Sequence, residues 1–461
     1  MSFTTFSFGA FFAAVFCVYW ALPQRLRKWA ALAASAAFYA PFGARSLAVL
    51  ALCAAASWGM GFAVAARRDS RARFAACIAL SLVPLALVKY APGMFGVVGV
   101  SFFTFKIIAY LAQVRAGEIE PERDFAAYAL YVSFFPEITS GPIQRASSLL
   151  PQIHAPRAFD ADKALACGQL IVWGMFKKLM IADNLAGYVQ KAYDQPDLYI
   201  GPSVLLAMVL YSVQLYCDFS GYSEMAVGMA GLLGFDVEDN FRMPYFARSI
   251  REFWAKWHIS LSTFLRDYVY FPLGGSRCGT WRTAFNLMAT FLVSGIWHGT
   301  GLTFLVWGLL HGVYQVAGRL TRTARSRAWS ALHIREDGAL ASCVKALVTF
   351  ALVTFAWIFF GAPSLERAFD VLRQIPSGFT LSVQTAKNAA AMLGFNAHTT
   401  LRMGLAMALM FGVEFLARRE GVAAWLAKRP AAFRYALCWA LCLAVLFWGA
   451  ASGGSFIYFE F

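Results

Sequence analysis

Long, nearly uncharged apolar runs are the feature that most limits what this chain can fold into. One run covers Thr5–Leu22, another covers Leu47–Ala66, and a run of about 36 residues lies between Arg282 and Arg319. About 20 apolar residues suffice for a membrane-spanning helix. Of the 461 residues, 60% are apolar and 14% are charged, against about 25% charged in soluble domains. The sequence therefore excludes a soluble enzyme, a disordered scaffold and a secreted disulfide-rich protein. It predicts an all-α, polytopic membrane protein with about 11 transmembrane helices.

The basic loops predict an orientation in the membrane. The formal net charge is +15, and Lys and Arg are dense at 67–73, 318–335 and 418–434. Cytoplasmic loops of membrane proteins are rich in Lys and Arg, so we expect these loops inside and both termini on the extracytoplasmic side. The residues before the first apolar run lack the basic segment of a signal peptide, so we expect this run to be a retained span.

Several apolar segments in the middle of the chain are interrupted by Pro, Gly and polar residues. The clearest interruptions are at 135–145 and 216–224. Non-helical backbone at membrane depth is tolerated only where protein or a water-filled cavity covers it. We therefore expect re-entrant segments around an internal cavity. No internal repeat relates two halves of the chain, which argues against a secondary transporter.

The segment 249–275 has the pattern of an amphipathic helix. Large apolar residues share one face of this helix: Ile250, Phe253, Trp254, Trp257 and Leu261. Charged residues share the other: Arg248, Arg251, Glu252 and Lys256. Such a helix is suited to the membrane surface. His258 lies at the flank of the apolar stripe, from which its side chain could turn inward.

His298 is the first candidate for chemistry. It lies where we expect two helices to meet, near Ser294–Gly301, with no Lys or Arg within ten positions. An ionisable side chain at this depth is costly and is a functional candidate by default. The alternative is a neutral histidine hydrogen-bonded to a neighbouring helix. We expect His311, in the same run, to have a packing or interfacial role rather than a catalytic one. Three further histidines lie in polar loops, and we expect no functional role for them: His154, His333 and His398.

A lone buried imidazole can act as a general base, a proton relay or a metal ligand. No carboxylate or cysteine accompanies His298 at ligand spacing, and the nine cysteines form no CxxC motif, so we expect no metal site. The GxSxG sequence of an α/β-type serine hydrolase does not occur. A lone base suits transfer of an acyl group from an activated thioester to a hydroxyl, because the enzyme mainly positions both groups and removes one proton.

Several long blocks of sequence resemble the membrane-bound O-acyltransferase family, and most closely its bacterial alginate O-acetyltransferase-like branch. These blocks are residues 101–125, 133–153, 175–186 and 213–241, the two histidine segments, and the tail GGSFIYFEF. The resemblance implies a ring of helices around a central funnel. It also implies that His298 is the catalytic histidine and His258 the second histidine of the bacterial members.

The resemblance covers nearly the whole chain and implies a single domain over residues 1–461. Within it, residues 1–90 would be N-terminal spans, residues 91–320 the core with both histidines, and residues 321–461 C-terminal spans with an extracytoplasmic tail.

The implied activity is O-acyl transfer at the bacterial cell inner membrane. An acyl thioester, with acetyl-CoA as the expected donor, would supply acetyl from the cytoplasm for an extracytoplasmic polysaccharide. Periplasmic or membrane-anchored acetyltransferase proteins would be the partners, besides membrane lipid, and we expect neither a bound cofactor nor nucleic-acid binding. Alternatives are a D-alanyl-type or other acyl export, a non-catalytic transporter of an acylated substrate, and a non-catalytic assembly subunit.

Four further residues are candidates for the site. Asp218, Ser220 and Tyr222 are polar groups in an apolar setting that would line the cavity or, equally, hydrogen-bond between helices. Tyr458, in the aromatic tail, matches a C-terminal tyrosine that is a proposed acyl relay in bacterial export-type acyltransferase systems. The alternative for Tyr458 is an aromatic anchor at the membrane interface.

Overall fold

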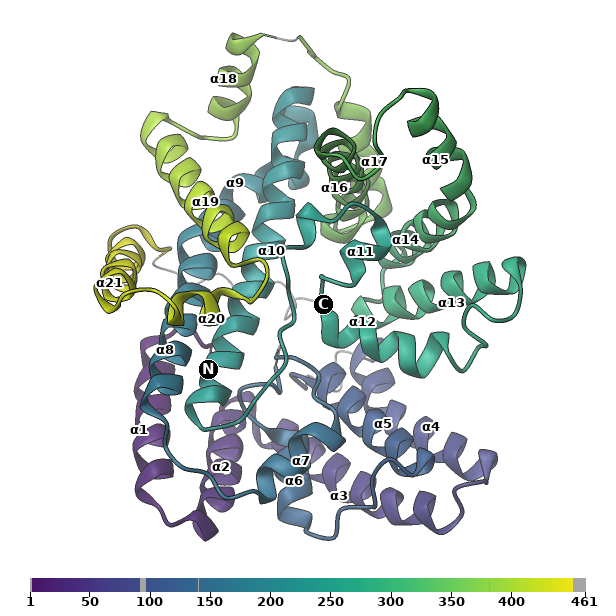
Figure 1. The fold of residues 1–461 in the computed structure, drawn as a ribbon, viewed down its shortest axis with the longest axis vertical. Coiled ribbons are helices and arrows are strands. Elements are labelled where there is room, and N and C mark those ends of the chain that lie inside the picture. Colours follow the sequence, from purple (N-terminus) through teal and green to yellow (C-terminus); the bar gives the residue numbers. More distant parts are fainter. Residues whose placement is uncertain (1, 92–96, 140, 381, 451–461) are drawn as a thin grey trace. The chain divides into compact units, whose positions relative to one another are not determined.

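The computed structural model describes residues 2–91, 97–139, 141–380 and 382–450, and all regular secondary structure in these ranges is helical. The all-α prediction is confirmed. The chain forms two compact units, and the helices of both are labelled in Figure 1. The first unit consists of Met1–Met175 and Tyr222–Asn240, and the second of Phe176–Gly221 and Phe241–Phe461.

The helices of the first unit come mainly from the N-terminal part of the chain. They are α1 (Phe6–Ala21), α2 (Gln24–Tyr39), the 3-10 turn η1 (Ala40–Phe42), α3 (Ala44–Ala66), α4 (Arg71–Tyr90), α5 (Val100–Ala116), α6 (Phe125–Ser133), α7 (Ala146–His154) and α8 (Ala161–Met175). Tyr222 and the residues that follow it in α10 (Gly201–Leu232) also belong to this unit.

The second unit begins with a π-helix that continues directly from α8. Its elements are the π-helix η2 (Phe176–Ala182), α9 (Asp183–Asp194), η3 (Pro196–Leu198), the first part of α10, η4 (Pro244–Phe246), α11 (Ile250–Trp254), α12 (Ile259–Leu265), the π-helix η5 (Arg266–Tyr270), α13 (Thr280–His298), α14 (Leu302–Leu320), α15 (Arg322–Ala331), α16 (Ala339–Gly361), α17 (Leu365–Gln374), α18 (Val383–Met392), α19 (Ala397–Ala417), α20 (Val422–Ala427) and α21 (Ala431–Trp448).

Seven helices among the described residues are long and apolar enough to cross a membrane. These candidate spans are Ala44–Ala66, Arg71–Tyr90, Ala161–Asp194, Gly201–Leu232, Ala339–Gly361, Ala397–Ala417 and Ala431–Trp448. The protein is therefore a multi-pass membrane protein. The prediction of about 11 spans also counted α1, which has 16 residues, and α13 and α14, which have 19 each. That higher number stays a prediction.

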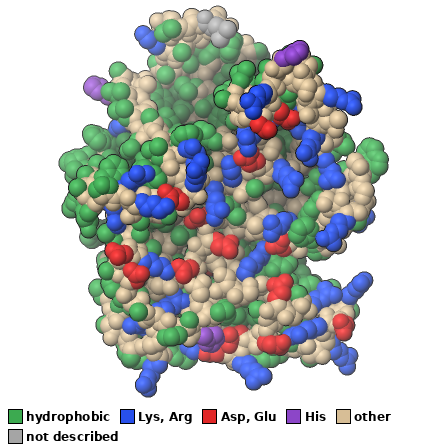
Figure 2. Space-filling model, viewed as in Figure 1, with side chains coloured by type: hydrophobic (Ala, Val, Ile, Leu, Met, Phe, Trp, Pro, Cys, Tyr) green, Lys and Arg blue, Asp and Glu red, His purple; other side chains and the backbone are tan. Residues whose placement is uncertain are grey.

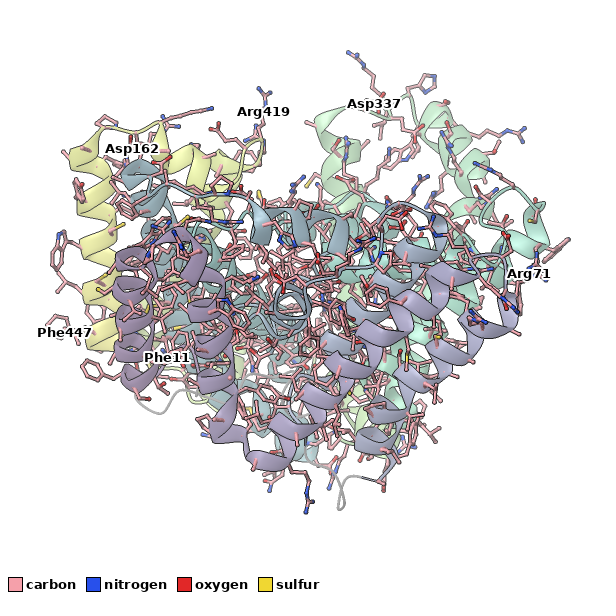
Figure 3. All side chains as sticks on the ribbon, turned by 90° about the horizontal axis from the view of Figure 1, so that it is seen from below. Phe11, Arg71, Asp162, Asp337, Arg419 and Phe447 are labelled. Atoms are coloured by element: carbon pink, nitrogen blue, oxygen red, sulfur yellow. The ribbon has the colours of Figure 1, made fainter. Side chains whose placement is uncertain are left out.

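The last candidate span, α21, illustrates why lipid is the natural solvent of these helices. It begins after Pro430, a residue that cannot donate to a preceding helical turn, and runs for 18 residues. Hydrophobic side chains cover the surface at α21 in Figure 2. Phe447, which is 69% exposed, points outward from the helix in Figure 3. Such a surface suits a hydrocarbon environment, because large exposed apolar patches are rare in water.

One predicted interruption is confirmed and the other is wrong. Residues 135–145, apart from residue 140, which is not described, are non-helical between α6 and α7. Residues 216–224, in contrast, lie inside the 32-residue helix α10. Two of the polar groups at this point are paired without a break in the helix. Ser220 Oγ donates to the Tyr216 carbonyl at 2.6 Å, and the Asp218 carboxylate forms an ion pair with Lys178 at 2.5 Å.

The prediction of one amphipathic surface helix over 249–275 is also wrong. The segment forms α11, a turn, α12 and η5, and the turn passes through His258 in the left-handed conformation at φ 42°. The apolar stripe faces protein rather than a membrane surface, because all five of its residues are less than 9% exposed. α11 contacts α14 and α16, and the Trp257 ring lies 5.1 Å from Trp357. Aromatic packing within the second unit therefore competes successfully with the membrane interface.

α13 and α14 pack unusually closely, and they lie next to each other in Figure 1. A Cβ atom at Gly308 of α14 would lie 2.5 Å from the Phe291 carbonyl oxygen of α13. A Cβ at Gly295 would lie equally close to the Phe304 carbonyl oxygen. Close approach through small residues is a common way for membrane helices to associate. This contact fixes the C-terminal end of α13, where His298 is the last helical residue.

Gly308→Ala is expected to destabilise the protein by about 1–3 kcal/mol, because the added methyl group meets backbone atoms that cannot move aside. The measurement is the thermal-unfolding midpoint in detergent. Gly318→Ala in the same helix is the control, since a Cβ there meets nothing within 4 Å. The control is expected to leave the midpoint unchanged or to raise it, because Ala favours a helix by about 1 kcal/mol over Gly. Equal changes in the unfolding midpoint for both substitutions would show that the close contact at Gly308 does not exclude a larger side chain.

Candidate active site

His298 lies at the predicted junction of two helices, as the last residue of α13, with Gly299 following it. Its side chain is buried, at 4% exposure. The imidazole lies edge-to-face with the Trp307 ring of α14, at a centroid distance of 4.9 Å, and with the Phe360 ring of α16, at 5.3 Å. Three helices of the second unit therefore position this one side chain in an aromatic environment.

His258 is fully buried and lies outside the seven candidate spans. Its ring contacts Phe219 of α10 at a centroid distance of 4.6 Å and Trp297 of α13 at 6.0 Å. Trp297 also contacts its neighbour His298 at 4.8 Å, so one indole ring contacts both histidines. Burial lowers the pKa of His258 to about 3, so this imidazole is neutral at physiological pH. A neutral imidazole can accept a proton or a hydrogen bond.

The remaining histidines have other surroundings. His311 is fully buried and accepts a hydrogen bond at Nδ1 from the Trp254 indole at 3.2 Å, so it packs inside the second unit as expected. His154 lies at the end of α7 and forms a 2.9 Å contact with the Glu122 carboxylate. His398 is an exposed residue at the start of α19.

Four buried polar atoms near His298 form no hydrogen bond within the described residues. They are Ser294 Oγ, Trp307 Nε1, His311 Nε2 and Trp357 Nε1. Leaving such a group buried and unpaired costs about 1–3 kcal/mol. Buried polar groups in native proteins are nearly always paired with protein or water. Buried polar atoms of this kind therefore occur on all three helices that surround His298.

The three residues predicted to line the cavity have different surroundings in the structure. Asp218, at 1% exposure, pairs with Lys178, and its neighbour Phe219 is the residue that contacts His258. Ser220 hydrogen-bonds within its own helix, not to a neighbouring helix. Tyr222 belongs to the first unit and stacks on Phe3 at a centroid distance of 4.4 Å. Asp218 and Ser220 are thus each next to Phe219, the residue that contacts His258, whereas Tyr222 is not.

Two buried lysines on the π-helix η2 were missed by the sequence reasoning. Lys177 Nζ lies 2.7 Å from the Glu414 carboxylate of α19, which also accepts from the Tyr216 hydroxyl at 2.7 Å. Lys178 lies 2.7 Å from Asp183 as well as 2.5 Å from Asp218. Adjacent lysines in the apolar sequence MFKKLMIA were an available signal, since buried charges in membrane segments are rarely incidental. π-Helical turns also occur frequently at functional sites.

Lys177→Met is expected to destabilise the protein by about 3–5 kcal/mol, because it leaves the Glu414 carboxylate buried without its counter-charge. The double variant Lys177→Met/Glu414→Gln is expected to recover most of this loss, since Gln keeps an oxygen acceptor for Tyr216. Thermal unfolding in detergent gives both values. Lys428→Met, which breaks the exposed Lys428–Glu420 pair, is the control and is expected to change stability by less than about 1 kcal/mol. A double variant less stable than Lys177→Met would contradict the ion-pair argument.

The C-terminal end of α21 is attached to the same π-helix. The Ala450 amide donates to the Leu179 carbonyl at 3.1 Å, and the Asn184 side-chain amide donates to the Trp448 carbonyl at 3.0 Å. Ala450, the last described residue, is therefore hydrogen-bonded to the residue that follows Lys178 in η2. Tyr458 lies outside the described residues.

The fold and these contacts define a multi-pass helical membrane protein with two buried histidines next to a shared tryptophan. The sequence profile of the membrane-bound O-acyltransferase family matches residues 99–364, which include both histidines. The chain belongs to the membrane-bound O-acyltransferase family.

The chain is similar in sequence to three bacterial proteins that are named as O-acetylases or O-acetyltransferases. It is 35% identical over 317 residues to the probable alginate O-acetylase of Pseudomonas aeruginosa, covering 69% of this chain and 58% of that protein. It is 33% identical to the probable alginate O-acetylase of Azotobacter vinelandii, covering 76% and 73%. It is 37% identical to the peptidoglycan O-acetyltransferase of Helicobacter pylori, covering 59% and 55%. The chain thus spans little more than half the length of two of these relatives.

Proposed function

We propose that this chain is an O-acyltransferase of the bacterial inner membrane, with His298 as its general base. The observation that carries the proposal is the position of His298, buried at a helix junction within the segment that matches the family. The imidazole takes the proton of an acceptor hydroxyl while that oxygen attacks the thioester carbonyl carbon. The C–S bond then breaks, and the thiolate leaves with the electron pair and regains a proton from the imidazolium. A positioned base of this kind contributes about 10²–10⁴-fold in rate.

His258 has a second role in this proposal. Its neutral imidazole orients donor or acceptor, or shares the proton with His298. The common contact of both rings with Trp297 supports a role at the same site. Asp218 acts indirectly, because its ion pair with Lys178 fixes the stretch of α10 that carries Phe219 against His258.

The proposed acyl group is acetyl, the donor is acetyl-CoA, and the final acceptor is an extracytoplasmic polysaccharide. The names of the similar proteins support acetyl transfer to a glycan but differ in the polymer, alginate in two cases and peptidoglycan in the third. Exported or membrane-anchored acetyltransferase proteins complete the transfer in this proposal. A D-alanyl-type acyl export is the main alternative.

The direct test uses the purified protein with radiolabelled acetyl-CoA. Label transfer or donor hydrolysis that depends on His298 supports the enzyme. Movement of an intact acylated substrate across vesicles, without cleavage of the thioester, supports the transporter instead. Unchanged polymer acetylation in cells with His298→Ala supports the non-catalytic assembly subunit.

Orientation is part of the proposal, because the donor is cytoplasmic and the acceptor is not. In intact cells a cysteine placed by Ser70→Cys, in the basic loop before α4, is expected to be shielded from impermeant thiol reagents. A cysteine placed by Gly454→Cys, in the tail, is expected to be labelled. Reactive native cysteines are first replaced, and Cys17, Cys278, Cys343 and Cys442 are exposed. The reverse labelling pattern would overturn the charge-based orientation.

Tyr458 is proposed as a transient acyl carrier between donor and partner. The hydrogen bond of Ala450 to Leu179 supports this role. Leu179 follows Lys178, which forms an ion pair with Asp218. Asp218 is next to Phe219, the residue that contacts His258. Tyr458 is eight positions after Ala450, which gives a reach of up to about 28 Å. A phenol, with a pKa of about 10, is activated by a histidine base more readily than a serine hydroxyl. The aryl ester stays reactive enough to pass on its acyl group.

A further inference from the structure

Two buried hydrogen-bond donors near His298 have no partner within the described residues. Ser294 Oγ and Trp307 Nε1 are buried and form no hydrogen bond within the described residues. A serine inside a helix ordinarily bonds the carbonyl four residues earlier, as Ser220 of α10 does. Thr290, one turn before Ser294 on α13, also makes this ordinary bond, to Asn286. Ser294 Oγ, in contrast, makes no such bond within the part of the chain that the structure describes.

Both unpaired donors adjoin His298. Ser294 precedes His298 by four residues on α13, and residues at this spacing are neighbours on one helix face. The Trp307 ring of α14 lies edge-to-face with the imidazole, at 4.9 Å and an interplanar angle of 86°. The packing of α13 against α14 at Gly295 and Gly308 fixes both elements relative to each other. Two hydrogen-bond donors therefore flank the proposed base from two rigid helices.

We propose that the Ser294 hydroxyl and the Trp307 indole N–H form an oxyanion site for the acyl carbonyl oxygen of a thioester. This inference rests on the function proposed above. When the acceptor oxygen forms its bond to the carbonyl carbon, the carbonyl π electrons move onto the carbonyl oxygen. That oxygen then accepts hydrogen bonds from the two donors. When the C–S bond breaks, the electrons return to re-form the carbonyl, and the thiolate takes the proton from the His298 imidazolium.

The unpaired state of the donors is what makes the site useful. Only interactions that are stronger in the transition state than in the ground state accelerate a reaction. Donors that are already fixed in place can hydrogen-bond to the oxyanion as it forms, without a cost for reorganising them during the reaction. Trp357 stacks on Trp307 at 5.8 Å and 18°, which holds the donor ring from its other side.

The test replaces each donor and measures steady-state release of CoA thiol from acetyl-CoA. Ser294→Ala removes the hydroxyl. At Trp307, 3-benzothienylalanine keeps the bicyclic shape and removes the N–H. Each change is expected to lower kcat by about 10²–10³-fold with the KM for acetyl-CoA within about threefold of the parent, because the donors act only in the transition state. The same benzothienylalanine at Trp425 of α20 is the matched control and is expected to leave kcat unchanged.

The thermal-unfolding midpoint separates this role from packing. Removing an unpaired donor loses no hydrogen bond, so neither variant is expected to lower the midpoint. A kcat near that of the parent in both variants would overturn the oxyanion site. A fall in kcat accompanied by a raised KM and a lowered midpoint would overturn it as well, in favour of a packing role. A parent chain that releases no thiol would contradict the proposed function itself, and this result is distinct because it precedes any substitution.

Discussion

His298→Ala is expected to lower acyl transfer by about 10²–10⁴-fold, because it removes the general base. Insertion and yield are expected to stay close to those of the parent. The substitution removes the contacts of the imidazole with rings of α14 and α16 but leaves the apolar spans intact. The assay is label transfer or thiol release from acetyl-CoA, with membrane insertion followed in parallel. His398→Ala, at an exposed position of α19, is the control and is expected to be as active as the parent.

Activity of the His298→Ala protein within a few-fold of the parent would eliminate the catalytic assignment. His258→Ala gives a further distinction. A smaller loss than in His298→Ala supports an orienting role for His258, and an equal loss supports a pair of histidines that share the proton.

Tyr458→Phe is expected to abolish polymer acetylation in cells, because it keeps the aromatic ring but removes the hydroxyl that would carry acetyl. The protein is expected to insert normally. The measurement is the acetyl content of the extracytoplasmic polymer, with protein abundance as the control. Normal acetylation in this variant would eliminate the relay and leave the interfacial anchor as the role of the tail.

The position of His298 could be predicted because its signal is local. An ionisable residue lies in the middle of a long apolar run, and the Gly-rich sequence after it ends the helix where the structure ends it. The seven candidate spans also follow from local composition. The break at His258 could not be predicted in this way. Apolar residues at helical spacing continue across it, and the turn depends on packing against α14 and α16, which are encoded much later in the chain.

The partners of the buried charged residues could not be predicted from the local sequence either. Lys177 looks anomalous in its own segment, but its partner Glu414 lies 237 positions away. The continuity of α10 through Asp218 likewise depends on Lys178, a residue of another helix. Local patterns therefore identified which residues were unusual, while the three-dimensional partners decided what each of them does.

The Lys177–Glu414 pair also constrains the order in which the protein can be made. Synthesis at about 5–20 residues per second delivers Glu414 roughly 12–50 s after Lys177 leaves the ribosome. During that interval the lysine lacks its counter-charge, and an uncompensated charge in a membrane interior is unfavourable. The π-helix that carries it therefore cannot reach its final buried state until α19 has entered the bilayer. A nascent chain arrested before α19 would lack this counter-charge, so the final burial of Lys177 depends on a helix that is made late in synthesis.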